Sequence, residues 1–533
     1  MNEAERTPQG ASGTTRPADP AERPRPGVGV TIARNSLWLT IDSLAGMAAS
    51  FYCSITVARS LGPELMGQYN YVLYFATVLR MFTEVSIPAT VRKFAAEFIG
   101  RGDYSTLKTL VGRALRVQAR LAAVGLAIGL AVSLAAFPDG QRVVATLAVL
   151  SIVPGLLLGI PTGALWATDK LRHNLVSSLA ATAANVVGVT VSLVAGWGLV
   201  GLTASLLLSR LLDCVLRFAL FRREFARLPG QAAPGRLDPL LRERMVRFAT
   251  QQMVLAFLYS MLFDRWEVFL LRGLAPSSEI AFFSISMTLV YYLLMIPQNL
   301  AGSASVTVWV QQGRSPEEAA RTTAIATWFI TLIAAPVLFG VAAIGDPLLR
   351  LLYGARYLPA IPVLTVLSLA SLSLAVSQPA QYLLVGAERQ RLYIAWLGLG
   401  AIVDLAACLL LIPRHGALGA ALAKGMGELV AGAGCLAYLA LQLRARLPLR
   451  RMGRLLLACA AMFACVRLVG RPLPPLAALL VGIPLGVATF GLLARALRCL
   501  DAADRDRLRG LDRLMPPRAR IGYRSVVDFL VPA

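Results

Sequence analysis

Fourteen apolar segments run through the chain, and their length limits what it can fold into. A membrane-spanning helix needs about 20 apolar residues, and these segments lack the alternation of a barrel strand. They cover residues 35–58, 68–90, 117–137, 143–166, 175–196, 199–221, 249–271, 280–302, 322–345, 360–385, 392–412, 417–440, 455–469 and 475–494. The sequence therefore predicts an all-α polytopic membrane protein with about 14 transmembrane helices, although segment 455–469 is short enough to leave the last two crossings open.

Composition excludes most other classes of protein. Of the 533 residues 57% are hydrophobic and 15% are charged, whereas soluble proteins carry about 25% charged residues. Seven cysteines without a CxxC pair and two histidines give no zinc pattern, so no metal is expected. Residues 1–30 are polar and proline-rich, which predicts a disordered tail without a cleavable signal peptide.

The net charge of +23 follows the loops of this topology. Only seven of the 52 Lys and Arg residues fall in the loops on one side of the predicted spans, and most of the others lie in the tails and in the loops of the opposite side. Lys and Arg residues are retained in the cytoplasm. We therefore expect both termini to be cytoplasmic, in a bacterial inner membrane, and we expect no nucleic-acid partner.

The two halves of the chain resemble each other. Residues 58–71 match residues 271–284 at an offset of 213, and two later pairs match at offsets of 219 and 218. The aligned pairs include Arg59 with Arg272, Pro63 with Pro276, Asp169 with Glu388, and Arg172 with Arg391. A repeat of six helices keeps its orientation, which predicts two lobes related by a pseudo-two-fold axis along the membrane normal.

This repeat predicts the domain organisation. We expect a cytoplasmic tail, an N-lobe of spans 1–6, an inter-lobe loop, a C-lobe of spans 7–12, a final pair of spans and a basic cytoplasmic tail. Their boundaries are 1–30, 31–221, 222–248, 249–440, 441–497 and 498–533.

Three segments carry a family resemblance. ARSLGPELMGQYNYVLYF followed by TEVSIPATVRKFAAE resembles the start of the Wzx-type oligosaccharide flippases, which belong to the MOP superfamily together with the MATE exporters. FDRWEVFLLRGLAPSSEIAFFSISMTLV is similar to the seventh-span block of these flippases, and IPRHGALGAALAKGMGEL to their turn between spans 11 and 12. The chain departs from the family at Glu84, where members often carry Asp.

The resemblance implies a transporter and not an enzyme. It implies that the protein moves an undecaprenyl-diphosphate-linked oligosaccharide from the inner to the outer leaflet by alternating access, for cell-surface polysaccharide export. Its partners would be membrane lipid, the lipid-linked glycan and other polysaccharide assembly proteins. A MATE-like multidrug antiporter and a lipid II flippase remain alternatives. The chain contains no P-loop, GxSxG or HExxH pattern.

Ionisable residues inside the predicted spans are candidate site residues, because a charge in the membrane is costly. The candidate substrate-binding cations are Arg80, Arg210, Arg265 and Lys424, with Arg265 the strongest partner for a diphosphate. The candidates for coupling to a proton or sodium ion, the only cofactor considered, are Asp42, Glu84, Asp264, Glu267 and Asp404. Alternatively, these groups form structural ion pairs, including the one-turn pairs Arg80–Glu84, Arg210–Asp213 and Lys424–Glu428.

Further candidates lie at the predicted cytoplasmic side and along the cavity. Arg113, Arg116 and Arg120 form one face of a helix, either to capture lipid phosphate at the entry or to extend to the interface. Asp169–Arg172 and Glu388–Arg391 are predicted to hold the cytoplasmic gate. The aromatic candidates for sugar stacking are Tyr69, Tyr71, Tyr291 and Tyr292, with ordinary packing as the alternative.

Overall fold

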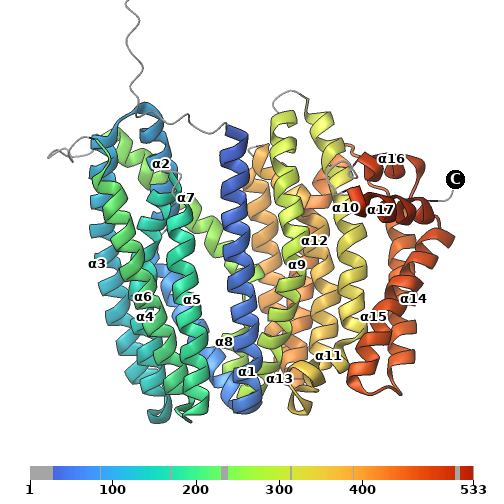
Figure 1. Cartoon of the computed structure of the whole chain (residues 1–533), viewed down its shortest axis with the longest axis horizontal. Helices are drawn as coiled ribbons and strands as arrows, with labels where there is room; N and C mark the ends of the chain where they lie inside the picture. The colour runs from blue at the N-terminus through green and yellow to red at the C-terminus, as the bar shows by residue number, and fades with distance from the viewer. Residues whose placement is uncertain are drawn as a thin grey trace, which may run out of the picture.

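The computed structural model describes residues 28–84, 86–167, 171–229, 238–312, 315–387, 389–510 and 517–531, and in these ranges it is helical without strands (Figure 1). The predicted tail 1–30 lies almost entirely outside the described residues. Eleven of the described helices are long and apolar enough to cross a membrane. The predicted all-α fold is confirmed.

Two of the long helices change direction at a glycine. The α1 helix (Val28–Glu84) reverses at Gly62, where φ is 76°, and the α13 helix (Gln390–Ala437) reverses at Gly416, where φ is 54°. Glycine enters this left-handed region without the steric cost that a Cβ atom imposes. Each helix therefore has two arms, and together with the broken pair α7–α8 the described chain has a helical segment at each of the 14 predicted spans.

The helices form two lobes and a C-terminal pair. The N-lobe contains both arms of α1 together with α2 (Ile87–Arg101), α3 (Tyr104–Ala136), α4 (Asp139–Ala167), α5 (Leu171–Val194) and α6 (Gly198–Ala226). The C-lobe contains α7 (Pro239–Phe263), α8 (Glu267–Leu274), α9 (Ser277–Gln312), α10 (Pro316–Ala343), α11 (Gly345–Leu352), η1 (Ala355–Tyr357), α12 (Ala360–Gly386) and α13. The chain continues through η2 (Tyr438–Gln442), α14 (Leu449–Gly470) and α15 (Pro475–Ala496).

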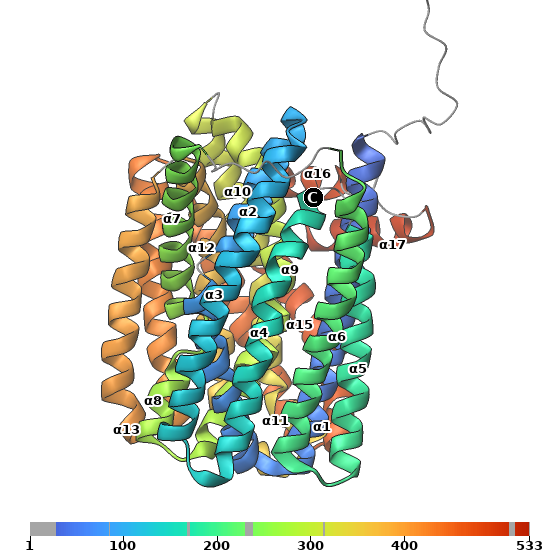
Figure 2. The same cartoon turned by 90° about the vertical axis from the view of Figure 1, so that its left-hand side faces the viewer.

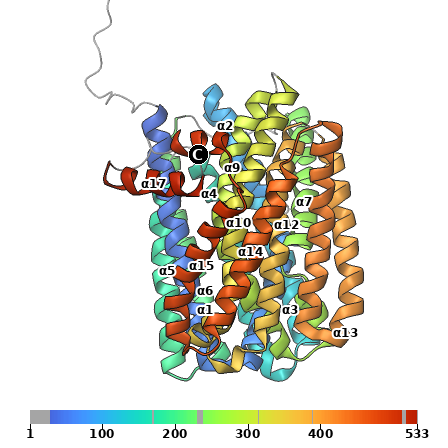
Figure 3. The same ribbon diagram turned by 90° about the vertical axis from the view of Figure 1, so that its right-hand side faces the viewer.

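The predicted basic tail 498–533 is helical where it is described. Two helices, α16 (Ala502–Gly510) and α17 (Pro517–Leu530), lie across the end of α14 and α15, on the same side of the molecule as the start of α1 (Figure 3). We call this side the termini face and the other side, where α11 lies, the opposite face (Figure 1). Arg495 donates to the Phe529 carbonyl at 2.7 Å, and Arg509 bonds Asp528 at 2.6 Å. The first contact attaches the tail to α15, and the second joins the two tail helices.

Helix ends near the termini face are capped by side chains. Asp103 accepts a hydrogen bond from the Thr106 backbone N–H at 3.0 Å and begins α3. Hydrogen bonding to Thr106 holds the pKa of Asp103 below its usual range. Ser315 begins α10 in the same way, by accepting from the Glu318 N–H.

At the opposite face the two lobes are joined by the repeated motif. Arg59 donates to the carbonyls of Leu351 and Leu352 across the interface, and its repeat partner Arg272 lies over the Tyr71 ring at 5.3 Å. The Tyr357 hydroxyl donates to the Ala58 carbonyl at 2.9 Å. Each lobe therefore reaches into the other with the arginine that precedes its Pro-containing turn.

At the termini face α7 joins the lobes. Its first half packs on α2, where Arg244 bonds Glu97 at 3.1 Å and the Lys93 ammonium lies 3.9 Å from the centre of the Phe248 ring. Further along α7, Leu255 packs into a buried cluster of the C-lobe. Figure 2 shows α7 beside α2 at this end, with α8 at the far end. The lobes are thus in contact at both faces.

Gly67 provides a test of the closed opposite face. A Cβ atom at this position would lie 1.7 Å from the Ser277 carbonyl oxygen, whereas one at Gly46 of the same helix would meet nothing within 4 Å. Gly67→Ala should therefore push the lobes apart by roughly 2 Å, to restore van der Waals distance.

The distance between spin labels at Val194 on α5 and Leu351 on α11, measured by pulsed electron resonance after replacement of the native cysteines, reports this separation. We expect a longer mean distance for Gly67→Ala and no change for Gly46→Ala. An unchanged distance in Gly67→Ala would contradict this packing.

Candidate functional site

A cavity of about 700 Å³ lies between the second arm of α1, α7 and α12, and we call it the α7 cavity. It holds three of the predicted ionisable residues, Arg80, Glu84 and Asp264. The other polar and aromatic residues of its wall are Tyr74, Thr77, Gln252, Tyr259, Ser260, Trp309, Gln378, Gln381, Tyr382 and Tyr393. Amides and aromatic rings with polar tips are groups that can bond sugar hydroxyls and stack on sugar rings.

The charged groups of the α7 cavity have local partners. Arg80 Nε lies 3.1 Å from Glu84 Oε2, so the predicted one-turn pair forms. Ser260 Oγ donates to Asp264 Oδ2 at 2.5 Å. One guanidinium and two carboxylates line this cavity. The side chains of Arg80 and Glu84 both remain partly exposed.

A second cavity, of about 620 Å³, lies between the two arms of α1, α5, α6 and α9, and we call it the Arg265 cavity. Arg265 is the one charged side chain among its described lining residues. Its guanidinium donates to Thr288 Oγ1 at 2.7 Å. The aromatic candidates Tyr69, Tyr291 and Tyr292 line the same space, with Asn70 and Asn185. An unbalanced guanidinium with hydroxyl and amide neighbours is suited to an anionic group.

The two cavities are separated at a break between α7 and α8. The α7 helix ends at Phe263, Asp264 is extended, and α8 begins at Glu267. Asp264 lines the α7 cavity and Arg265 lines the other, although the two residues are adjacent in the sequence. The break therefore presents a carboxylate and a guanidinium to different spaces.

A buried cluster of charges holds this break. Lys424 Nζ on the second arm of α13 donates to the Asp264 main-chain carbonyl at 2.6 Å and to Glu267 Oε1 at 3.0 Å. Lys424 thus satisfies the last carbonyl of α7 and the first carboxylate of α8. Trp266 Nε1 donates to Asp404 Oδ2 at 3.0 Å from the other side. The side chains of Lys424 and Glu267 are 1% and 0% exposed.

These contacts change the assignment of three candidates. Lys424, Glu267 and Asp404 line neither of the two cavities, because they are enclosed by α8 and the two arms of α13. Lys424 forms an ion pair with Glu267, which lies on a different helix. The predicted pair with Glu428 on its own helix therefore does not account for all of its contacts. Lys424 therefore lies at the break between the cavities.

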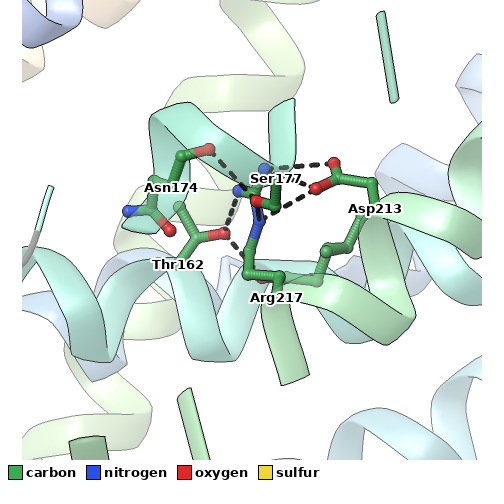
Figure 4. A network of polar contacts seen from close by, with 6 residues as sticks. Thr162, Asn174, Ser177, Asp213 and Arg217 are labelled. Atoms are coloured by element: carbon green, nitrogen blue, oxygen red, sulfur yellow. Dashed lines mark hydrogen bonds and ion pairs between the residues drawn. The ribbon is translucent and has the colours of Figure 1, made fainter. Parts of the chain in front are cut away.

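The predicted pair Arg210–Asp213 is wrong. Asp213 binds Arg217, with Oδ1 and Oδ2 at 2.8 and 3.0 Å from Nη2 (Figure 4). Arg210 has an exposed side chain on α6. Arg217 also donates to Thr162 Oγ1 at 2.7 Å and Ser177 Oγ at 3.0 Å. The spacing of four residues could have suggested the pair Asp213–Arg217. It was missed because Arg217 lies near the polar end of the predicted span. It joins α4, α5 and α6 inside the N-lobe.

The remaining candidates are not brought together with the cavities. Asp42 is half-buried on the first arm of α1, beside the cavity residue Ser43, and bonds no described residue. On α3, Arg113 is half-buried while Arg116 and Arg120 are exposed. Arg172 and Arg391 are exposed, and their predicted partners Asp169 and Glu388 lie outside the described residues.

Sequence reasoning missed much of the wall of the α7 cavity. Gln378 and Gln381 are buried amides one turn apart on α12, and Trp309 donates to the Tyr382 carbonyl at 2.8 Å. Gly386 leaves room for that indole, since a Cβ there would lie 2.2 Å from a ring carbon. Two glutamines one turn apart in an apolar span were the available signal.

Residues 32–310, just over half of the chain, match the family model described as polysaccharide biosynthesis protein. The chain belongs to this family. A search of curated protein sequences gives no significant match.

Several solved structures share the fold. Lipid II flippase MurJ in an inward closed conformation superposes with a TM-score of 0.67 at 14% identity, over 86% of this chain and 99% of that one. An inward-facing MATE multidrug resistance transporter of the MOP superfamily gives 0.64 at 13% identity, over 78% and 98%. A MOP superfamily transporter from Pyrococcus furiosus gives 0.52 at 13% identity, over 77% and 95%. The chain thus has the MOP fold of a multi-pass membrane transporter, as the sequence predicted.

Breaking the buried cluster should destabilise the fold. Lys424→Met leaves the fully buried Glu267 without its cation, and such a loss costs about 3–5 kcal/mol. The double variant Glu267→Gln with Lys424→Met removes both charges and should regain most of this free energy of unfolding.

Unfolding in mixed micelles, followed by circular dichroism, measures these differences. Arg265→Ala is the matched control, because Arg265 faces a cavity and should change stability by less than about 1 kcal/mol. Equal stability of Lys424→Met and the wild type would show that the cluster does not hold the break.

Proposed function

We propose that this protein flips an undecaprenyl-diphosphate-linked oligosaccharide from the cytoplasmic to the outer leaflet of the bacterial inner membrane. The observation that supports the proposal is Arg265, whose guanidinium is the one charged side chain among the described lining residues of a cavity between the lobes. A guanidinium binds phosphate oxygens through paired donors and keeps its charge at every physiological pH. It supplies the compensation that a diphosphate needs inside the membrane.

The glycan is assigned to the α7 cavity. Its aromatic rings, amides and the Arg80–Glu84 pair provide the stacking surfaces and hydrogen-bonding groups of a sugar site. The two cavities adjoin at the residues 264 and 265, so a diphosphate beside Arg265 and a sugar beside Asp264 fit one amphiphile. The prenyl chain remains in the lipid bilayer, so it keeps its apolar surroundings at no cost in free energy.

Release to the outer leaflet requires the opposite face to open. The contacts of Arg59 with Leu351 and Leu352, and of Arg272 with Tyr71, would break in that state. The contacts of α7 with α2 would break to admit substrate from the cytoplasm. Rocking of one repeat against the other provides such alternation. In this proposal the termini face lies in the cytoplasm, which the basic loops on that side support.

Lipid II flipping is the second candidate. The superposition with lipid II flippase MurJ covers 86% of this chain, and lipid II carries the same kind of diphosphate. The MATE-like alternative would have to use the α7 cavity, where two carboxylates outnumber one guanidinium, because a cationic drug would be repelled by Arg265 in the other cavity.

Sealed liposomes containing the purified protein can test the class of substrate. We expect transbilayer movement of a fluorescent undecaprenyl-diphosphate oligosaccharide and no movement of a cationic dye. Movement of lipid II alone would favour the second candidate, and movement of the dye alone would overturn the proposal.

Arg265→Ala should slow this movement at least tenfold, because the diphosphate loses its charge-assisted hydrogen bonds. The control is Arg142→Ala, which removes an exposed arginine at the opposite face that pairs with Asp139. It should leave the rate within about twofold of wild type. Equal rates for Arg265→Ala and wild type would remove Arg265 from the mechanism.

Asp264, Glu84 and Asp42 are the proposed carboxylates for coupling to a proton or sodium gradient. Asp264→Asn keeps the hydrogen bond with Ser260 within reach but cannot exchange a proton or bind a cation strongly. We expect a rate that no longer responds to an imposed pH or sodium gradient. A full response in Asp264→Asn, with loss of response in Glu84→Gln or Asp42→Asn, would reassign the role.

A further inference from the structure

A third cavity lies at the termini face, away from both cavities between the lobes. It has a volume of about 820 Å³ and is enclosed by the start of α10, the connection from η2 to α14, and α16. Figure 3 shows α16 and α17 beside α10 and α14 at this end. The tail helices thus complete a space that the C-lobe and the C-terminal pair leave open.

Arginines dominate the wall of this cavity. Five of them contribute, against two carboxylates, which are those of Glu317 and Asp504. The arginines are Arg321, Arg444, Arg446, Arg451 and Arg507. Even if both carboxylates are ionised, the lining keeps an excess of three positive charges.

The two carboxylates do not neutralise the whole set. Asp504, which is 1% exposed, lies 2.9 Å from Arg451 and 3.5 Å from Arg507. Arg451 also pairs with Asp501 at 2.8 Å. Arg321, Arg444 and Arg446 bond no described residue, and their side chains are exposed. Three guanidinium groups are therefore available to an anion.

The backbone conformation brings two of these arginines, Arg444 and Arg446, to the same wall. The chain leaves the C-lobe through a π-helical turn, Tyr438–Gln442, and Arg444 follows with φ at 49°, in the left-handed region that a non-glycine residue seldom occupies. This conformation turns the connection back toward α10 and puts Arg444 and Arg446 on the same wall. Such strain persists only where the surrounding structure imposes it.

The remaining wall is apolar and follows α10 toward the membrane. It contains Ala320, Ala324, Ile325 and Trp328 of α10 and Leu443 of the connection. Arg451 lies over the Trp328 ring at 5.4 Å, so the charged and apolar parts are continuous. A space with cations at the mouth and an apolar wall below fits an amphiphile with a phosphate head.

We propose that this cavity binds the phosphodiester headgroup of an anionic phospholipid of the inner leaflet, with an acyl chain along α10. Basic pockets at the cytoplasmic ends of transmembrane helices are suited to anionic headgroups. A free phosphate is also an anion, but it has no apolar part that would contact the apolar wall. The site holds the C-terminal helices to the C-lobe through the lipid, and its binding does not depend on whether the protein is a flippase.

Native mass spectrometry of the full-length protein in detergent measures the binding. We expect retention of phosphatidylglycerol in preference to phosphatidylcholine, with at least about tenfold weaker binding in the double variant Arg444→Gln with Arg446→Gln. The matched control is Arg450→Gln with Arg454→Gln, which removes two exposed arginines of α14 that do not line the cavity. Its affinity should stay within about twofold of wild type.

Three results would overturn the proposal. One is an equal loss of phosphatidylglycerol affinity in the two double variants, which would indicate binding to diffuse surface charge. Another is an unchanged phosphatidylglycerol affinity in the double variant of Arg444 and Arg446 or in Arg321→Gln. The third is displacement of the lipid by millimolar inorganic phosphate together with equal affinity for a short-chain phosphatidylglycerol, which would indicate a site for free phosphate. Unfolding curves that match wild type show that each variant is folded.

Discussion

The ion pair between Lys424 and Glu267 is the contact on which the centre of this protein depends. It lies at the point where α7 stops, and the same ammonium takes the free carbonyl of Asp264. A buried pair contributes little net stability but fixes a conformation, because either charge alone would be very costly. Here the conformation is a break in a membrane helix, which presents Asp264 and Arg265 to different cavities.

The repeat explains how two closed faces can enclose these cavities. Arg59 and Arg272 occupy equivalent places in the two lobes, and each reaches across the interface at the opposite face. At the termini face the closing contacts are made by α7, which packs on α2 and then returns to its own lobe. The two faces are therefore closed by different means, which allows them to open at different times.

Much of the fold could be predicted from the sequence, because apolar segment length sets the number of crossings and Lys and Arg cluster in the loops of one side. Arg265 was assigned to a cavity because it is a permanent cation inside a predicted span, and it lines one. The partners of buried charges could not be predicted so well. Asp213 binds Arg217, which lies one turn further along the same helix, whereas Lys424 binds Glu267 on another helix, a contact that depends on how helices pack. The tail was predicted only as a basic extension, because its composition does not show contacts such as that of Phe529 with Arg495 of α15.

The central claim is that Arg265 receives the diphosphate of a lipid-linked glycan. The most direct test is a cryo-electron microscopy structure of the protein in nanodiscs with an undecaprenyl-diphosphate oligosaccharide. We expect density for the diphosphate within hydrogen-bonding distance of the Arg265 guanidinium and for sugars in the α7 cavity. A diphosphate bound elsewhere, with the Arg265 cavity empty, would contradict the claim.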